Sequence, residues 1–170
     1  MRTGVGSEGC VIMSPRSMGV SMTAVVIRDV AADILQRMRK EPSMFTDPEG
    51  PIERFDWGEF TIAGRVHGAG GRGAGKDVRV IGTEVTPWKE RKGHVLSPPM
   101  ISGVYGQGIE TLIIGNGVHG MLECPQEIRD AVEAHGIPDL RVLRTPDACR
   151  LYNQLVRDGR KVALLAHGTC

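Results

Sequence analysis

The second half of the chain alternates short apolar runs with stretches of helical spacing. Residues 111–114, 140–143 and 162–166 are rich in Leu, Ile, Val and Ala, a composition typical of strands that are covered on both faces. Between these runs, the segments that begin at Pro125 and Thr145 place apolar side chains on one side of a helix. This strand-helix-strand-helix-strand order predicts parallel strands joined by right-handed crossovers.

The two predicted helices have recognisable start and stop signals. Thr145 can cap the second helix, Pro146 fits its first turn, and Asp147 favours its positive end. Gly136 and Gly159 are expected to end the first and second helix.

Upstream of these elements, the apolar spacing predicts an antiparallel β unit. Residues 55–62 predict one strand, residues 78–81 a second, and residues 85–88 a short third strand. The glycine-rich stretch 68–75 is expected to form a loop. A short helix is predicted at 97–105, where Ser and Pro residues provide a start. We expect the antiparallel strands to extend or flank the parallel sheet.

The first 50 residues differ from the rest of the chain in composition and in the spacing of apolar residues. Residues 1–21 are rich in Gly, Ser and Met without periodicity, which predicts disorder. Residues 24–39 carry apolar side chains at helical spacing, followed by a Pro-rich linker. We therefore divide the chain into an N-terminal extension (residues 1–50) and a single α/β domain (residues 51–170). The predicted helix packs on the domain, or it binds a partner or acts in targeting.

Composition narrows the functional classes. The chain has 21 Lys and Arg against 20 Asp and Glu, a net charge of +1, and no dense basic run, so we expect no nucleic-acid partner. No stretch approaches the ~20 apolar residues of a membrane span. Four cysteines without a Cys-x-x-Cys pair favour reduced intracellular thiols. We expect a cytoplasmic protein, and the Arg-containing N-terminal extension leaves organelle targeting open.

Two glycine motifs imitate nucleotide-binding loops. Residues 115–120 spell G-x-G-x-x-G after a strand, but the next helix begins only near Pro125 and the following strand ends in Arg144 rather than an acid. Residues 70–76 imitate a phosphate loop, but Asp77 stands where Ser or Thr should bind magnesium. We interpret both motifs as backbone turns and expect no cofactor.

Histidine and cysteine residues follow two of the predicted strands. His119 and Cys124 lie beyond the first parallel strand, and His167 and Cys170 lie beyond the third. If these strands are neighbours, the four side chains could gather at one sheet edge, which would suit zinc. Their spacing matches no known zinc motif, so a metal or redox site is the weakest hypothesis and no metal is assigned. An α-carboxylate at Cys170 would disfavour its thiolate, and no catalytic residue is assigned.

The carboxyl edge of the parallel strands is the best candidate for a ligand site, because open α/β sheets bind ligands there. The amide groups after Thr145 and the guanidinium of Arg144 could hold a small anion. The charged loop 88–94 is expected to be a solvated turn, or else an anion or partner contact. The candidate ligand-binding residues are Gly115, Asn116, Gly117, Arg144, Thr145, Asn153 and His167.

An ordered set of short motifs covers the chain from Phe55 to Cys170. The motifs are Phe55-Asp-Trp57-Gly58, Val85-Thr-Pro87-Trp88, Gly93-His94, Leu112-Ile-Ile-Gly115-Asn-Gly117, Gly136-Ile137, Arg144-Thr145, Tyr152-Asn153-Gln-Leu155 and Ala166-His167-Gly168-Thr169-Cys170. Their order and spacing resemble the adipogenesis-associated MTH domain family, of the nine-three-eight type.

This resemblance implies a three-layer α/β fold with a central mixed sheet, and no established enzyme activity. One relative in the family is a mitochondrial assembly factor for respiratory complex I, and another is linked to fat-cell differentiation. The loop 68–75 departs from the family as an insertion into a hairpin, and residues 1–50 have no counterpart in the core domain.

Two functional hypotheses follow from these observations. The first is a non-enzymatic binding or assembly module that presents the α/β domain to an unknown protein partner, because no complete catalytic constellation is visible. The alternative is a small-molecule or anion-binding protein, or an unrecognised enzyme, that uses the carboxyl edge of the parallel strands.

Overall fold

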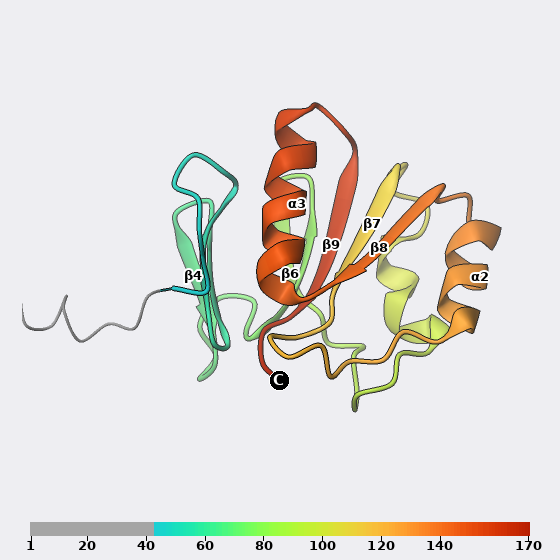
Figure 1. Ribbon diagram of the computed structural model, residues 1–170, viewed down its shortest axis with the longest axis horizontal. Coiled ribbons are helices and arrows are strands. Elements are labelled where there is room, and N and C mark those ends of the chain that lie inside the picture. Colours follow the sequence, from blue (N-terminus) through green and yellow to red (C-terminus); the bar gives the residue numbers. More distant parts are fainter. Residues whose placement is uncertain (1–42) are drawn as a thin grey trace, which may run out of the picture. The chain divides into compact units, whose positions relative to one another are not determined.

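The computed structural model describes residues 43–170, and the chain from Pro42 to Cys170 forms one compact unit (Figure 1). The disorder predicted at 1–21 and the helix predicted at 24–39 lie outside the described residues. In chain order, the elements are β1 (Phe45–Thr46), β2 (Ile52–Asp56), β3 (Glu59–Ile62), β4 (Arg65–Gly68), β5 (Asp77–Ile81), β6 (Glu84–Pro87), the 3-10 helix η1 (Pro98–Val104), β7 (Thr111–Gly115), α2 (Gln126–Ala134), β8 (Asp139–Leu143), α3 (Thr145–Arg157) and β9 (Val162–His167).

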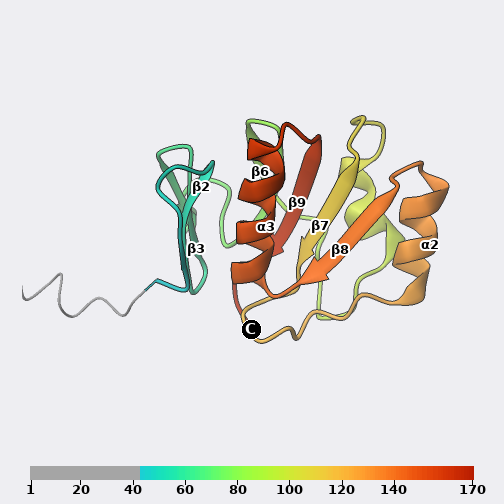
Figure 2. The same cartoon turned by 45° about the horizontal axis from the view of Figure 1, so that its top comes forward.

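A five-stranded mixed sheet forms the centre of the domain. Its strand order is β6-β5-β9-β7-β8, and β7 pairs in parallel with both β8 and β9. The predicted parallel βαβαβ unit is therefore confirmed (Figure 2). Strand β5 pairs antiparallel with β9 and with β6, so this hairpin extends the parallel unit into a mixed sheet.

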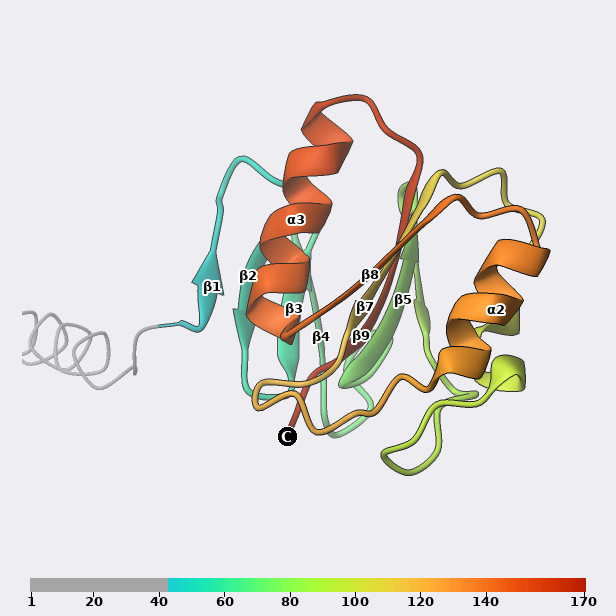
Figure 3. The ribbon, with the colours of Figure 1, turned by 45° about the vertical axis from the view of Figure 1, so that its right-hand side comes forward.

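Helices cover both faces of this sheet, which confirms the α/β architecture with its central mixed sheet (Figure 3). Helix α3 packs against β7 and β9 on one face, while α2 and η1 share a core with the other face. Along β9, Leu164 and Ala166 face the α3 side, whereas Ala163 and Leu165 face α2 and η1. Both sides of β9 therefore need apolar side chains, which explains the uninterrupted apolar run.

A second, antiparallel sheet of four strands, in the order β1-β2-β3-β4, flanks the first. The single strand predicted at 55–62 is wrong, because a turn at Trp57-Gly58 separates β2 from β3. The sequence signals this turn: the apolar positions are odd-numbered up to Trp57 and even-numbered from Phe60, which breaks the two-residue period. The rings of Phe55 and Phe60 lie 4.6 Å apart and pack into the core on the α3 side.

Asn153 of α3 ties the helix to the four-stranded sheet. Its fully buried amide accepts a hydrogen bond from Ile52 N at 3.0 Å and donates to Ile52 O at 2.8 Å and Asp47 Oδ2 at 2.9 Å. Strand β1 pairs with β2 although it precedes the domain boundary predicted at residue 51. Among the described residues, no helix combines the length and apolar character that crossing a membrane requires.

Candidate functional site

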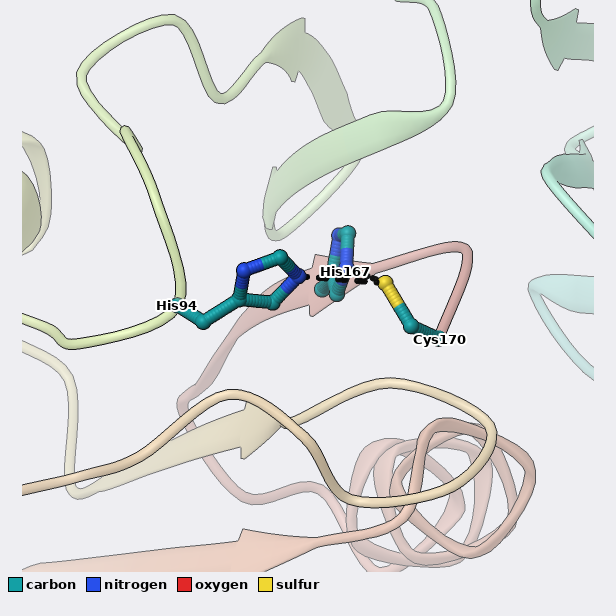
Figure 4. A group of neighbouring side chains, drawn as sticks. All are labelled: His94, His167 and Cys170. Atoms are coloured by element: carbon teal, nitrogen blue, oxygen red, sulfur yellow. Dashed lines mark hydrogen bonds between the residues drawn. The ribbon is translucent and has the colours of Figure 1, made fainter.

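The end of β9 brings together polar side chains from distant parts of the chain. The antiparallel register places Asp77, the first residue of β5, opposite His167, the last residue of β9. The loop between β6 and η1 adds Arg91 and His94, and Cys170 follows shortly after β9. In Figure 4, the rings of His94 and His167 both approach the sulfur of Cys170.

A charged network fixes the orientation of His167. Asp77 Oδ1 lies 2.6 Å from His167 Nδ1, and Arg91 Nη2 donates to Asp77 Oδ2 at 2.8 Å. Burial acts to raise the pKa of Asp77, but hydrogen bonds from His167 and Arg91 outweigh it and lower this pKa to about 2. An ionised carboxylate can only accept hydrogen bonds, so His167 Nδ1 carries a proton. A neutral His167 therefore presents the lone pair of Nε2 to its other neighbour.

That neighbour is the thiol of Cys170, which lies between two imidazoles. Its Sγ is 3.2 Å from His167 Nε2 and 3.3 Å from His94 Nε2. The hydroxyl of Thr169 lies 3.4 Å from His167 Nε2. His167 is buried, Cys170 is half-buried and His94 is exposed. The cluster is therefore anchored in the core on one side and open to solvent on the other.

This geometry permits two kinds of chemistry. His167, oriented by Asp77, is placed to accept the proton of the Cys170 thiol, as the base does when a thiol nucleophile is activated. The same sulfur and nitrogen atoms, together with His94, are also typical ligands of a borderline-soft divalent cation. Both would act through the sulfur of Cys170.

Two of the predicted ligand residues build the support beneath this cluster. Thr145 Oγ1 donates to His167 O at 2.7 Å and accepts from Gly117 N at 3.0 Å. Gly117 has a φ of 99°, and a Cβ added there would overlap the carbonyl oxygen of Cys170. The segment after β9 thus covers the glycine turn that contains the predicted ligand residue Gly117.

The other predicted ligand residues are more scattered. Gly115 lies against Thr145, and Arg144 is exposed. Asn116 is half-buried, and its Oδ1 has no hydrogen-bond partner within the described residues. Asn153 does not join the group, because its side chain is buried against β2.

The histidine and cysteine residues meet only in part. Strands β7 and β9 are neighbours, yet His167 and Cys170 are not joined by His119 and Cys124. His119 lies beside Trp57, with ring centroids 5.7 Å apart, and Cys124 packs against the core on the α2 side. His94, from the charged loop 88–94, lies beside His167 and Cys170 instead of His119 and Cys124.

Sequence reasoning misses three members of the cluster. In the sequence, Asp77 is only a mismatch to a phosphate loop, and Arg91 and His94 belong to a loop expected to be a solvated turn or a contact. The signal that could identify Asp77 is the pairing of β5 with β9, which places it opposite His167. No local spacing reveals that pairing.

Residues 52–167 match a family model described as "Protein of unknown function (DUF498/DUF598)". The chain belongs to this family. The matched segment runs from the start of β2 to the end of β9. It therefore contains both ends of the Asp77–His167 contact.

Solved structures share the fold of this DUF498 chain. One described as MT938 is 27% identical, with 72% of this chain and 100% of that chain covered and a TM-score of 0.56. Another, described as an outer membrane protein from Bartonella henselae, is 26% identical, with 76% and 100% covered and a TM-score of 0.58. The conserved hypothetical protein PH1505 from Pyrococcus horikoshii, 20% identical with 70% and 98% covered, has a TM-score of 0.58. The resemblance to the nine-three-eight type is confirmed.

Exposed apolar side chains stand on the loops that border the cluster in this DUF498 chain. Trp57, Val95 and Met121 are 52%, 51% and 57% exposed, the highest values among the large apolar side chains of the described residues. Trp57 lies beside the loop that carries Met121, and Val95 directly follows His94. We call these three residues, together with His94 and Cys170, the β9-end surface.

An apolar pocket of about 450 Å³ lies at the opposite end of β9, where the strand begins. It opens between the two sheets and the end of α3. Its lining includes Ile62, Val80, Val85, Ile109, Val156 and Lys161.

Proposed function

We propose that this domain is a non-enzymatic binding module that docks onto a partner protein through the β9-end surface. The observation that supports the proposal is that the three most exposed large apolar side chains of the described residues, Trp57, Val95 and Met121, stand on loops that border one polar cluster. Exposed large apolar side chains beside polar groups are typical of protein interaction sites. Trp and Met are also among the residues enriched at interfaces.

Backbone hydrogen bonds hold the loops of this surface in place. Gly58 N, beside Trp57, donates to Gly168 O at 2.6 Å. On the other side, Glu123 N donates to His94 O at 2.7 Å, and Leu96 N donates to Glu123 O at 3.0 Å. A surface that is already ordered loses little conformational entropy on binding. The surface therefore suits a specific partner.

The charges near the surface indicate the chemistry of that partner. Lys76, Lys92 and Arg144 are exposed and lie within two residues of Asp77, His94 and Thr145, respectively, whereas one exposed acid, Glu123, lies two residues from Met121, so positive charge is in excess. We expect a partner that inserts an apolar side chain flanked by carboxylates, because complementary charges guide association and orientation. A role as a protein-complex assembly factor, implied by one family relative, would use such a surface.

The test compares partner capture by two matched variants of the full chain. One carries Trp57→Ala, Val95→Ser and Met121→Ser. The control carries Met44→Ser and Val66→Ser, which alter the remaining two exposed large apolar residues of the described chain, at 39% and 41% exposure. Proteins enriched by the immobilised wild type from the native extract are quantified by mass spectrometry, and circular dichroism checks that both variants are folded.

We expect the control to retain the partner and the triple variant to lose it at least tenfold, because interface anchors typically contribute more than about 1.4 kcal/mol each. Equal capture by both variants, or no specific enrichment by the wild type, would contradict the proposal.

The apolar pocket supports a second candidate function, the binding of a small molecule. Its lining is mostly aliphatic, and Arg160 and Lys161 also line it. A pocket of this size and composition suits an apolar chain with an anionic head group. We expect medium-chain carboxylates to raise the Tm more than the corresponding alcohols, and Lys161→Ala to reduce that preference. Identical unfolding curves with and without these compounds would remove this candidate.

A further inference from the structure

We propose that His94, His167 and Cys170 form a site for a zinc-like divalent cation, with one coordination position left open. Their three donor atoms all lie within 4.8 Å of one another. The donors come from the loop after β6, the end of β9 and the segment that follows it, and they converge from different sides (Figure 4). The proposal does not depend on a protein partner, because this chain supplies every ligand named.

The two sulfur–nitrogen distances in the cluster are close to what a tetrahedral cation requires. With Zn–S and Zn–N bonds of about 2.3 and 2.0–2.1 Å, the sulfur and each nitrogen should be about 3.6 Å apart, and the two nitrogens about 3.3 Å apart. The sulfur of Cys170 lies 3.2 Å from His167 Nε2 and 3.3 Å from His94 Nε2. Each sulfur–nitrogen distance needs to lengthen by only a few tenths of an ångström. The two nitrogens lie within 4.8 Å of each other, and the ring of His94 is exposed, so it can move to bring them to the required distance.

The surroundings of His167 match those of a metal-bound histidine. Such a ring usually donates its second N–H to a carboxylate, which fixes the tautomer and strengthens the ligand nitrogen. Here the carboxylate is Asp77, 2.6 Å from His167 Nδ1. Arg91 holds Asp77 in turn through Nε at 3.2 Å and Nη2 at 2.8 Å. The buried half of the site is therefore oriented before any cation arrives.

The donor set also selects the class of cation. One thiolate and two imidazoles suit Zn²⁺ and neighbouring transition metals, whereas Mg²⁺ and Ca²⁺ prefer oxygen ligands. Three protein ligands leave a fourth position for water or for a group from another molecule.

Without a cation, hydrogen bonds among the three side chains can satisfy the same sulfur and nitrogen atoms. The thiol can donate to His167 Nε2 while His94 donates its own N–H to the sulfur. A cation would replace the thiol proton, so its binding must release a proton and grow stronger with rising pH. Proton release on addition of the cation therefore distinguishes the cation-bound cluster from the hydrogen-bonded cluster.

The experiment uses the full chain after treatment with a chelator. Zn²⁺ is titrated in competition with a chromophoric chelator, and Co²⁺ is titrated as a spectroscopic substitute. We expect one equivalent of Zn²⁺ to bind, with proton release, and Co²⁺ to show a thiolate-to-metal charge-transfer band. Cys170→Ser should abolish that band, and His94→Ala should weaken Zn²⁺ binding at least tenfold.

Two further variants keep the result interpretable. Cys124→Ser removes a half-buried thiol outside the cluster and should leave Zn²⁺ affinity unchanged. Asp77→Asn keeps all three proposed ligands but weakens the support of His167, so it should weaken binding by about 10–100-fold without abolishing the cobalt band. Circular dichroism establishes that each variant is folded.

The proposal is overturned if the folded wild type shows no saturable Zn²⁺ binding. It is also overturned if Cys170→Ser binds as the wild type does, or if Cys124→Ser loses the cobalt band. Failure of the partner-capture experiment would leave these measurements unaffected, because they use the purified chain alone.

Discussion

Replacing Asn153 by alanine separates a structural role for this residue from a role in ligand binding. The side chain of Asn153 is fully buried, as is that of Ile52. Two of its hydrogen bonds go to the backbone N–H and C=O of Ile52, at 3.0 and 2.8 Å. Alanine would leave both backbone groups without these partners where β2 meets α3.

The expected loss of stability follows from the N–H and C=O groups of Ile52 that lose their partners. A buried group that loses its partner costs about 1–3 kcal/mol, so we expect the free energy of unfolding to fall by about 3 kcal/mol. The compact unit runs from residue 42 to 170, and unfolding entropy is about 2.1 cal/mol/K per residue. The Tm should therefore fall by about 10 °C.

Urea unfolding followed by circular dichroism measures this loss, with Asn116→Ala as the matched control. Asn116 is half-buried, and its single side-chain hydrogen bond, to Gly120 O, is long at 3.5 Å. We expect the control to lose less than about 1 kcal/mol. If Asn153→Ala destabilises no more than Asn116→Ala, the reasoning that Asn153 joins α3 to β2 is refuted.

Three further predictions concern the cluster and its surroundings. The pKa of Asp77 is lowered to about 2 in the folded state, so its ionised form stabilises the fold by about 2 kcal/mol above pH ~4, and this stabilisation is lost as the pH falls through 2. Between pH 5 and pH 2.5, urea unfolding should show the wild type losing about 1.5 kcal/mol more than Asp77→Asn does, and equal losses would contradict this prediction. Gly117→Ala should lower the free energy of unfolding in urea by about 3 kcal/mol, because the added Cβ is strained at a left-handed φ and also overlaps Cys170. The control Gly136→Ala has a φ of 75° and open space around it, so it should lower this free energy by about 1 kcal/mol. Similar losses for both variants would show that the overlap with Cys170 is relieved at no cost. Burial raises the pKa of the Cys149 thiol well above its usual range. Iodoacetamide should therefore modify Cys170 in the native chain and Cys149 only after unfolding, which mass spectrometry of the alkylated peptides measures. Modification of both cysteines at equal rates in the native chain would contradict this prediction.

The parallel half of the fold could be predicted because its signals are local. The apolar runs at 111–114 and 162–166 reflect strands buried on both faces, and Thr145-Pro146 marks the start of α3. The four-stranded sheet could not be predicted in full. Strand β1 has only two residues and β4 only four, with half of β4 exposed, so neither carries a readable period.

Only the part of the candidate site that follows from the order of the parallel strands could be predicted from the sequence. His167 could be placed at a ligand edge because it ends a buried strand that neighbours β7. Its contact with Asp77 joins residues 90 positions apart, and the contact between His94 and Cys170 joins residues 76 positions apart. Such contacts are fixed by the register of β5 on β9 and by the path of one loop. A single sequence does not encode them as a motif.

The position of β9 has a consequence for how the domain is made. It lies between β5 and β7 in the sheet, yet it follows both of them in the sequence. A ribosome therefore completes both neighbours before it makes the strand that joins them. Until β9 emerges, β5 and β7 present open edges that can pair with other chains. The domain must consequently postpone closure of its central sheet until its last described strand is synthesised, and a chain interrupted before Val162 would be an aggregation hazard rather than a smaller folded protein.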